Sequence, residues 1–412
     1  MEKHIRPALI CAFASLACLA GTKAEETPFA EKVTRQYVEI ASARYQDSYD
    51  TARLLMDAIR EFVRNPSEET HKQAKEAWII AHKVYSLTEV FRFGNPNVDA
   101  WETKVNAWPI DEGFLDYVAP TYSYEGGNPH ALYNLIASEF FIDDGYIAEA
   151  RSEMDPKAGV YHGFTDNETN VATGYHTIEF LLWGQDLNQS PKEAGLRPYT
   201  DYVLGENGTG GNMDRRRQYL MAISGILLQD LTTAIQDWKT DRPFLYSKVF
   251  FDLPVEQQLD RMVMGMGSLS NGELAGERIQ VALLASDQEE EQSCFSDTTH
   301  IAIYQNALSV QSLYHGQHHM HNGQKIEGPS LSELVAKLDQ NLDAELTQKF
   351  VETMEAAQGV VDRAEKIEPF DRMIQSGNEE GRAVLNELIS RLKAQTELIE
   401  KVHMMVPELA KQ

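Results

Sequence analysis

Residues 213–238 read MDRRRQYLMAISGILLQDLTTAIQDW, and this stretch decides the fold. Its apolar residues recur every three or four positions, so they form one stripe along a helix. The stripe consists of Tyr219, Leu220, Ile223, Ile226, Leu227, Leu231, Ile235 and Trp238. Because a stripe of this length must be buried against other helices, it predicts a helical bundle.

The same helical period recurs through most of the chain. It predicts further helices over residues 29–62, 67–93, 129–139, 144–153, 170–183, 254–286, 330–338, 343–366 and 378–406. Asn65-Pro66 ends the first of these helices, and Ser67 can cap the second. Two stretches, 95–128 and 292–328, read as long loops in which only short hairpins are expected. The predicted fold class is therefore all-α.

The length of 412 residues favours two domains. We place their boundary after Trp238, within residues 239–253, which gives an N-terminal helical-bundle domain over 25–240 and a C-terminal helical-bundle domain over 241–412. In each half a long helix precedes a second helix that runs into a loop, and this repeat of architecture suggests a duplication. The prediction is two helical-bundle domains related by duplication, with long decorated loops.

The N-terminus, residues 1–24, has the pattern of a secretory signal peptide. A basic start is followed by an apolar run over residues 8–21 and by small residues before Ala24, so cleavage after Ala24 is expected. Cys18 is not favoured as a lipid anchor, because the preceding Ser15-Leu16-Ala17 fits a lipidation motif poorly. The protein is thus expected to be exported, to the periplasm or the cell envelope. No later stretch is long enough for a transmembrane helix.

The net charge and the cysteine content limit the partners and the disulfides that this protein can have. The formal net charge is −26, and cleavage removes three basic residues and one acidic residue, which brings it to −28. Such an acidic chain repels nucleic acid and anionic lipid, so neither is an expected partner. Cys294 is the one cysteine outside the signal, so the mature chain has no pair for an intramolecular disulfide.

The segment GYHTIE, residues 174–179, carries the first candidate site. His176 and Glu179 are three apart on a predicted helix, so they share a face with Cβ atoms about 5–6 Å apart. An imidazole and a carboxylate so placed can bind one metal ion. A histidine and a glutamate at this spacing can also form a simple hydrogen bond with each other. Two ligands, moreover, make only half of a metal site.

A second pair with the same spacing lies in the other half, in CFSDTTH at residues 294–300. If the halves pack face to face, Asp297 and His300 can converge with the first pair. The alternative is that Ser296 or Asp297 caps the helix that begins near Thr298, and both interpretations can hold together.

Glu89, in TEVFR at residues 88–92, is a third candidate. It lies at the end of a predicted helix with Arg92 on the same face, so the alternative is a surface ion pair. The residues expected to line a cleft beside the candidate ligands are Gly174, Arg92, Trp183, Gln185, Asp186 and Ser296.

Several familiar patterns are absent. The sequence has no HExxH, no G-x-S-x-G and no P-loop, which removes the usual signatures of a zinc protease, a serine hydrolase and a nucleotide-binding enzyme. The loop HGQHHMH, residues 315–321, can bind metal adventitiously, but its polar setting indicates a solvated loop.

The chain resembles a known family at several spaced motifs. GYHTIEFLLWGQD at 174–186 resembles the GxHxxE signature of the imelysin family, also classed as M75 peptidases. FRFGNPN at 91–97, NGELAGER at 271–278 and SCFSDTTH at 293–300 are similar to the branch called iron-regulated protein A. The resemblance implies two duplicated helical-bundle domains with the GxHxxE helix near the cleft between them. It also implies an exported protein connected with iron uptake.

The resulting hypothesis is a protein of iron binding or iron acquisition. His176 and Glu179 are the expected metal ligands, with Glu89, Asp297 and His300 completing the site across the cleft. Imidazole and carboxylate suit iron or zinc, and iron is favoured only through the resemblance. The expected partners are a metal ion or chelated iron and the iron-uptake components of the cell envelope.

Two other classes stay open. The first is a metallopeptidase of the M75 type, which needs an open metal position holding an activated water and a base beside it. Glu179 is the catalytic candidate in that case, provided that it is not itself a ligand. The second is a non-catalytic module that binds a partner or chelated iron in the cleft. The missing protease signatures favour a protein that is not an enzyme.

Overall fold

The computed structural model describes residues 27–123, 128–139, 167–187, 194–240 and 245–412. The helices of the first part of the chain are α1 (Phe29–Arg64), α2 (Glu68–Tyr85), η1 (Ser86–Phe91), α3 (Pro96–Glu102), α4 (Glu112–Leu115), α6 (Tyr175–Trp183), η2 (Tyr199–Tyr202) and α7 (Met213–Trp238). The signal segment 1–24 and the helix expected at 144–153 lie outside the described residues.

The later elements are also mainly helices. They are α8 (Tyr246–Phe251), α9 (Val255–Gly267), η3 (Ser268–Val281), α10 (Ala282–Ala285), η4 (Gln288–Glu290), α11 (Thr299–Tyr314), α12 (Leu331–Leu338), α13 (Gln340–Lys366), α14 (Phe370–Met373), α15 (Glu379–Met404) and α16 (Val406–Leu409). The strands β1 (Gln317–His319) and β2 (Lys325–Glu327) pair as a short antiparallel hairpin. The all-α prediction is confirmed.

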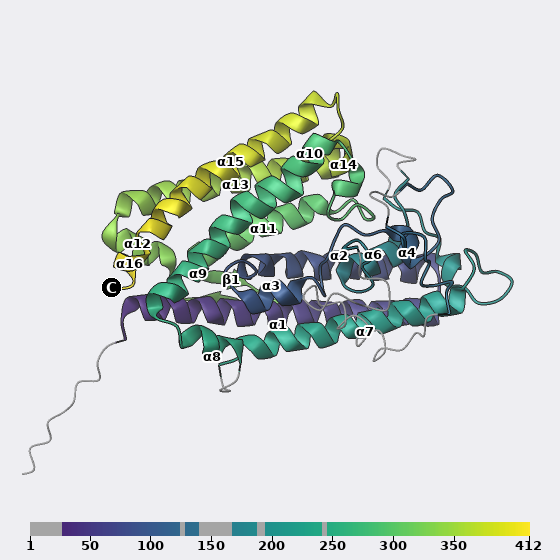
Figure 1. The fold of residues 1–412 in the computed structure, drawn as a ribbon, viewed down its shortest axis with the longest axis horizontal. Helices are drawn as coiled ribbons and strands as arrows, with labels where there is room; N and C mark the ends of the chain where they lie inside the picture. Colours follow the sequence, from purple (N-terminus) through teal and green to yellow (C-terminus); the bar gives the residue numbers. More distant parts are fainter. Residues whose placement is uncertain (1–26, 124–127, 140–166, 188–193, 241–244) are drawn as a thin grey trace, which may run out of the picture.

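The helices form two layers (Figure 1). α1 lies against α2 and α7 in one layer, while α11, α13 and α15 pack together in the other. The two layers meet where α11 contacts η1 and where α9 contacts α1. One apolar core crosses this junction and includes Tyr37 of α1, Phe91 of η1 and Ile399 of α15. The division at residue 240 and the duplication of the halves stay predictions.

The helix starts and stops follow the sequence signals closely. Ser67 caps α2, and its hydroxyl accepts a hydrogen bond from the Thr70 N–H at 3.2 Å. The predicted helix over 254–286 forms as a continuous helical run, α9–η3–α10, whose middle section η3 is a π-helix of 14 residues. Within the described ranges, none of the helices combines the length and the hydropathy that crossing a bilayer requires.

The helix expected at 129–139 does not form, and that prediction is wrong. The segment makes a series of turns, and Asn134 has a positive φ of 52°. The backbone N–H groups of Asn134, Leu135 and Ile136 donate to the carbonyls of residues 113–115. These backbone groups therefore bond to the α4 segment instead of to a helix of their own.

The stretch 292–328, expected to be loop, contains the 16-residue helix α11. This helix buries polar side chains on several faces, among them His300, Gln305, Asn306 and Ser309. A helix surrounded by others shows no single apolar stripe, so periodicity alone does not reveal it. The loop prediction for 292–328 is correct only for the segments before and after α11.

Candidate functional site

Helix α6 carries the GxHxxE segment and is wholly enclosed. All nine of its residues are buried. Gly174 precedes the helix with φ of 96° and Gly184 follows it with φ of 71°. Both are conformations that residues with a side chain rarely adopt, so the two glycines set the start and the end of α6.

Replacing Gly174 with alanine is expected to destabilise the fold by about 3 kcal/mol. The new Cβ would lie 2.5 Å from the Val105 carbonyl oxygen, and the positive φ would add strain. The control is Gly205→Ala, because Gly205 has φ of 84° and no atom within 4 Å of an added Cβ. Urea unfolding of both variants measures the difference. If both variants lost the same free energy of unfolding, the contact of the added Cβ with Val105 would not be destabilising.

Glu179 joins helix α6 to the C-terminal half of the chain. Its Oε2 lies 2.8 Å from His176 Nδ1. Its Oε1 accepts hydrogen bonds from the Ser296 N–H at 3.0 Å and the Ser296 hydroxyl at 2.6 Å. The sequence-predicted residues His176, Glu179 and Ser296 are therefore in direct contact.

Burial controls the protonation of this pair. It lowers the pKa of His176 to about 3, and the nearby charge of Arg278 acts in the same direction. It also raises the pKa of Glu179 to about 8, although the two hydrogen bonds from Ser296 oppose the rise. Near neutral pH the imidazole is neutral. When Glu179 is ionised, which a bound cation favours, it accepts the Nδ1–H bond of His176 and leaves the lone pair on Nε2 free to bind a metal ion.

His176 Nε2 is the atom that can act as a ligand. It is buried, and no described residue gives it a hydrogen-bond partner. The rings of His82 and Trp78 flank the imidazole edge-to-face, with centroids 5.0 and 6.3 Å away. Trp78 is fixed because its indole N–H donates to the Tyr175 carbonyl oxygen at 2.8 Å.

Glu89 lies further along a chain of polar contacts from His176. His82 Nε2 lies 3.0 Å from Asn106 Oδ1, and the Asn106 amide donates to Glu89 Oε1 at 3.3 Å. Glu89 Oε2 accepts from Arg278 at 2.8 Å, in a pair that is almost fully buried. Glu89 is thus tied to an arginine of the other half and not to Arg92.

Arg278 is the centre of this buried polar cluster. Besides Glu89 it donates to Glu273 at 3.0 Å, to Gln292 at 3.0 Å and to Asn306 at 3.3 Å. Glu273 and Arg278 are five residues apart and both belong to η3. The wider turn of a π-helix, with its i to i+5 bonds, brings such residues onto one face. The π-helix therefore helps to present Arg278 to Glu89.

Arg92 lies at the edge of the same cluster. It pairs with Asp99 at 3.1 Å, with Glu102 at 3.7 Å and with Glu273 at 3.4 Å. Its guanidinium also lies over the Phe93 ring. Arg92 therefore balances carboxylates at the junction of the two layers, and its ion pairs connect it to Glu89 through Glu273 and Arg278.

The other expected cleft residues follow α6. Trp183 packs edge-to-face on Trp78 at 5.5 Å. Gln185 accepts from the Ala119 N–H at 2.6 Å and donates to Glu112 at 2.9 Å. Asp186 is buried, and its charge helps to raise the pKa of Asp297. This side of α6 is consequently acidic.

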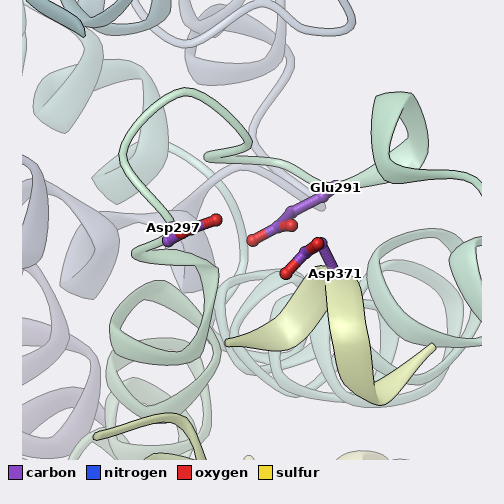
Figure 2. A group of neighbouring side chains, drawn as sticks. All are labelled: Glu291, Asp297 and Asp371. Atoms are coloured by element: carbon purple, nitrogen blue, oxygen red, sulfur yellow. The ribbon is translucent and has the colours of Figure 1, made fainter. Parts of the chain in front are cut away.

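Asp297 turns towards a separate group of carboxylates. It has a φ of 55°, and one of its oxygens lies within 4.8 Å of oxygens from Glu291 and Asp371 (Figure 2). His300 lies in the first turn of α11, and burial lowers its pKa to about 4. No side-chain hydrogen bond caps α11, so capping by Ser296 or Asp297 is not observed.

Sequence reasoning missed several residues of this region. His82, Asn106 and Arg278 complete the cluster around His176 and Glu89, and Glu291 and Asp371 complete the carboxylate group. The available signal was polar or charged residues inside segments with strong helical period, as for His82 in α2. Nothing in the sequence indicates that residue 371 meets residue 291.

These features define a class: an all-α protein of two helical layers, with a buried histidine–glutamate pair on one half held by a serine of the other. The sequence pattern of the imelysin family, also classified as peptidase M75, matches residues 41–399. The chain belongs to the imelysin family. No curated protein matches it.

Solved structures share the fold. One is the crystal structure of a putative iron-regulated protein A precursor from Parabacteroides distasonis ATCC 8503, with a TM-score of 0.62 and 17% sequence identity over 93% of this chain and 97% of that chain. Another is an imelysin-like protein from Psychrobacter arcticum 273-4, with a TM-score of 0.54 and 13% identity over 90% of this chain and 93% of that chain.

Proposed function

We propose that this protein is an exported iron-binding protein that takes part in iron acquisition, and that the ion binds at the His176–Glu179 pair where the two halves meet. The observation that carries the proposal is His176 Nε2, a buried imidazole nitrogen with no partner among the described residues. Membership of the imelysin family and the iron-regulated name of a protein with the same fold support iron as the metal.

The donor set fits a metal ion. Metal-binding histidines usually donate their second ring N–H to a carboxylate, which fixes the tautomer and the ring orientation. Glu179 stands in that relation to His176 Nδ1, and Ser296 fixes Glu179 in turn. In this arrangement His176 supplies the ligand atom and Glu179 orients it. Glu179 becomes a ligand itself if Oε2 leaves Nδ1.

Residues near the His176–Glu179 pair are the candidates for the remaining ligands of the ion. Glu89 is linked to His176 through Asn106 and His82, and we retain it as a candidate ligand that would exchange its pair with Arg278 for the ion. Asp297 and His300 lie on the segment that follows Ser296, and we retain them as candidates from the other half. Chelated iron is an equally suitable cargo if the chelator supplies the missing ligands. Partners in the cell envelope would then receive the ion.

Replacing His176 with alanine is expected to abolish stoichiometric iron binding, because the free ligand atom is removed. Glu179→Ala should weaken affinity by about 10–100-fold, the usual cost of losing a carboxylate that orients a histidine ligand. Equilibrium dialysis of purified mature protein with iron, followed by metal analysis, measures both effects.

The matched control is His319→Ala, because His319 is exposed in the hairpin of the histidine-rich loop. This variant should bind iron as the parent does. If His319→Ala loses the ion and His176→Ala keeps it, binding is adventitious and the proposal is wrong. Folding of each variant is checked by its thermal unfolding midpoint.

The same variants test the metallopeptidase alternative. A peptidase requires chelator-sensitive cleavage of a peptide that Glu179→Gln removes, since the activated water needs a base. Iron binding without such cleavage supports a binding protein. Cleavage that survives in Glu179→Gln excludes Glu179 as the base.

A further inference from the structure

Three carboxylates from two distant parts of the chain meet beside the loop that holds Glu179. Glu291 follows η4, Asp297 precedes α11 and Asp371 lies in the short helix α14. One oxygen from each lies within 4.8 Å of the others (Figure 2). Oxygens that bind the same Ca²⁺ at 2.3–2.6 Å lie at most about 5 Å apart. The three groups are therefore close enough to share one ion.

Glu291 is the observation that distinguishes this group from an ordinary acidic surface. Its side chain is 2% exposed and points towards Asp371 and Asp297. Neither of its carboxylate oxygens makes a hydrogen bond of normal geometry with a described residue, although the Thr299 hydroxyl lies close enough to favour the charged form. A buried carboxylate without partners is costly, so it normally pairs with a cation or stays protonated.

The electrostatics around the group favour a cation. Burial and neighbouring carboxylates, Asp186 among them, raise the pKa of Asp297 to about 7 and that of Asp371 to about 6. Arg372 is the neighbouring cation, with its Nε 3.2 Å from Asp371 Oδ2. When ionised, three carboxylates beside one arginine carry an excess of negative charge, and the raised pKa values reflect the cost of that ionisation without a further cation. A divalent ion would balance that excess.

We propose that Glu291, Asp297 and Asp371 form a second cation site that takes a hard divalent ion of the Ca²⁺ or Mn²⁺ class. Carboxylate oxygens alone select hard cations, whereas imidazole and thiolate ligands select softer transition metals. The ion would link α14 to the segment between η4 and α11, which lies more than 70 residues earlier in the sequence. It would thereby order the loop that carries Ser296.

The His176–Glu179 pair gives no ligand atom to this site, and Asp297 is the one residue that is a candidate for both sites, whereas Glu291 and Asp371 belong to this site alone. Both oxygens of Glu179 are engaged by Ser296 and His176. The proposal therefore does not rest on the proposed function, and the two sites can be tested separately. They are coupled through one loop, because Asp297 follows directly after Ser296.

Calorimetric titration of the mature protein with Ca²⁺ in 150 mM KCl tests the site. The parent protein should bind one Ca²⁺ per chain and gain several degrees in unfolding temperature. Glu291→Gln should weaken that binding at least tenfold and remove the temperature gain. Without Ca²⁺, Glu291→Gln should unfold at the same temperature as the parent or higher, since it removes a buried charge, so loss of binding is not loss of fold.

Two controls separate the possible outcomes. Glu289→Gln changes an exposed residue of the same acidic run and should leave Ca²⁺ binding unchanged. His176→Ala should also keep it, while losing iron. Equal responses of Glu289→Gln and Glu291→Gln would show unspecific binding to an acidic surface and overturn the proposal. Absence of Ca²⁺ and Mn²⁺ binding in the parent would overturn it as well.

Discussion

Replacing Arg278 with methionine is expected to lower the free energy of unfolding by about 3–5 kcal/mol, the usual cost of breaking a buried ion pair by removing one partner. Arg278 is fully buried and neutralises Glu89 and Glu273, and its charge also acts on Glu102. Methionine keeps much of the side-chain length but leaves these carboxylates without their central cation. Urea unfolding at pH 7 measures the loss.

The double variant Arg278→Met, Glu89→Gln distinguishes electrostatics from packing. It should be more stable than Arg278→Met alone, because it removes the carboxylate that lost its partner, with a coupling of about 0.5–3 kcal/mol. Arg391→Met is the surface control, since Arg391 forms exposed or half-exposed pairs with Glu387 and Glu352 that water screens, and it should be replaceable with little loss. A double variant less stable than the single one would mean that packing dominates.

The position of Arg278 also connects the fold to the candidate site. Its guanidinium holds Glu89 on the first half through η3 on the second, and its charge contributes to the low pKa of His176. A cation at His176 must therefore be balanced by the surrounding carboxylates. The buried network thus ties metal binding to the contact between the layers.

The sequence predicts the helices that have one exposed face. The helix predicted over residues 213–238 has the same bounds as α7, and the predicted cap at Ser67 is confirmed. For α11 the sequence indicates a start near Thr298 but not the length of the helix, which is covered on several sides and buries His300 and Asn306. Periodicity reports contrast between two faces, and α11 has none.

In the candidate site, too, contacts within one helix could be predicted from the sequence, whereas contacts between distant segments could not. The contact of His176 with Glu179 follows from their spacing of three within a helix. The partner of Glu89 does not, because spacing favours Arg92 whereas the structure places Arg278 there, 189 residues away. The meeting of Glu291 with Asp371 depends likewise on where the fold places α14 relative to the loop before α11.

Replacing Asp116 with asparagine is expected to destabilise the protein by a similar amount, about 3–5 kcal/mol at pH 7. Asp116 follows α4, and Arg216 of α7 donates to both of its oxygens, at 2.6 and 3.0 Å. Arg197 adds a bond at 2.8 Å, and all three side chains are at most 1% exposed. Asparagine keeps the shape but leaves two buried guanidinium groups with too little negative charge.

The effect of Asp116→Asn should depend on pH in a defined direction. Burial alone would raise the pKa of Asp116, but Arg197 and Arg216 outweigh it and hold the pKa below its usual range. A lowered pKa stabilises the folded state above the unfolded pKa of about 3.9, and this stabilisation is lost as the pH falls through the folded value. The gap between parent and variant should therefore stay constant from pH 7 to pH 5 and shrink below pH 4.

Urea unfolding at a series of pH values from 7 to 3.5 measures this gap. Asp57→Asn is the control, because Asp57 forms an exposed i,i+3 pair with Arg60 and should show little difference from the parent at any pH. A gap that persists unchanged below pH 4 would mean that Asp116 stabilises through its shape and hydrogen bonds alone. A gap that closes on acidification identifies the carboxylate charge as the group that holds α4, the η2 segment and α7 together.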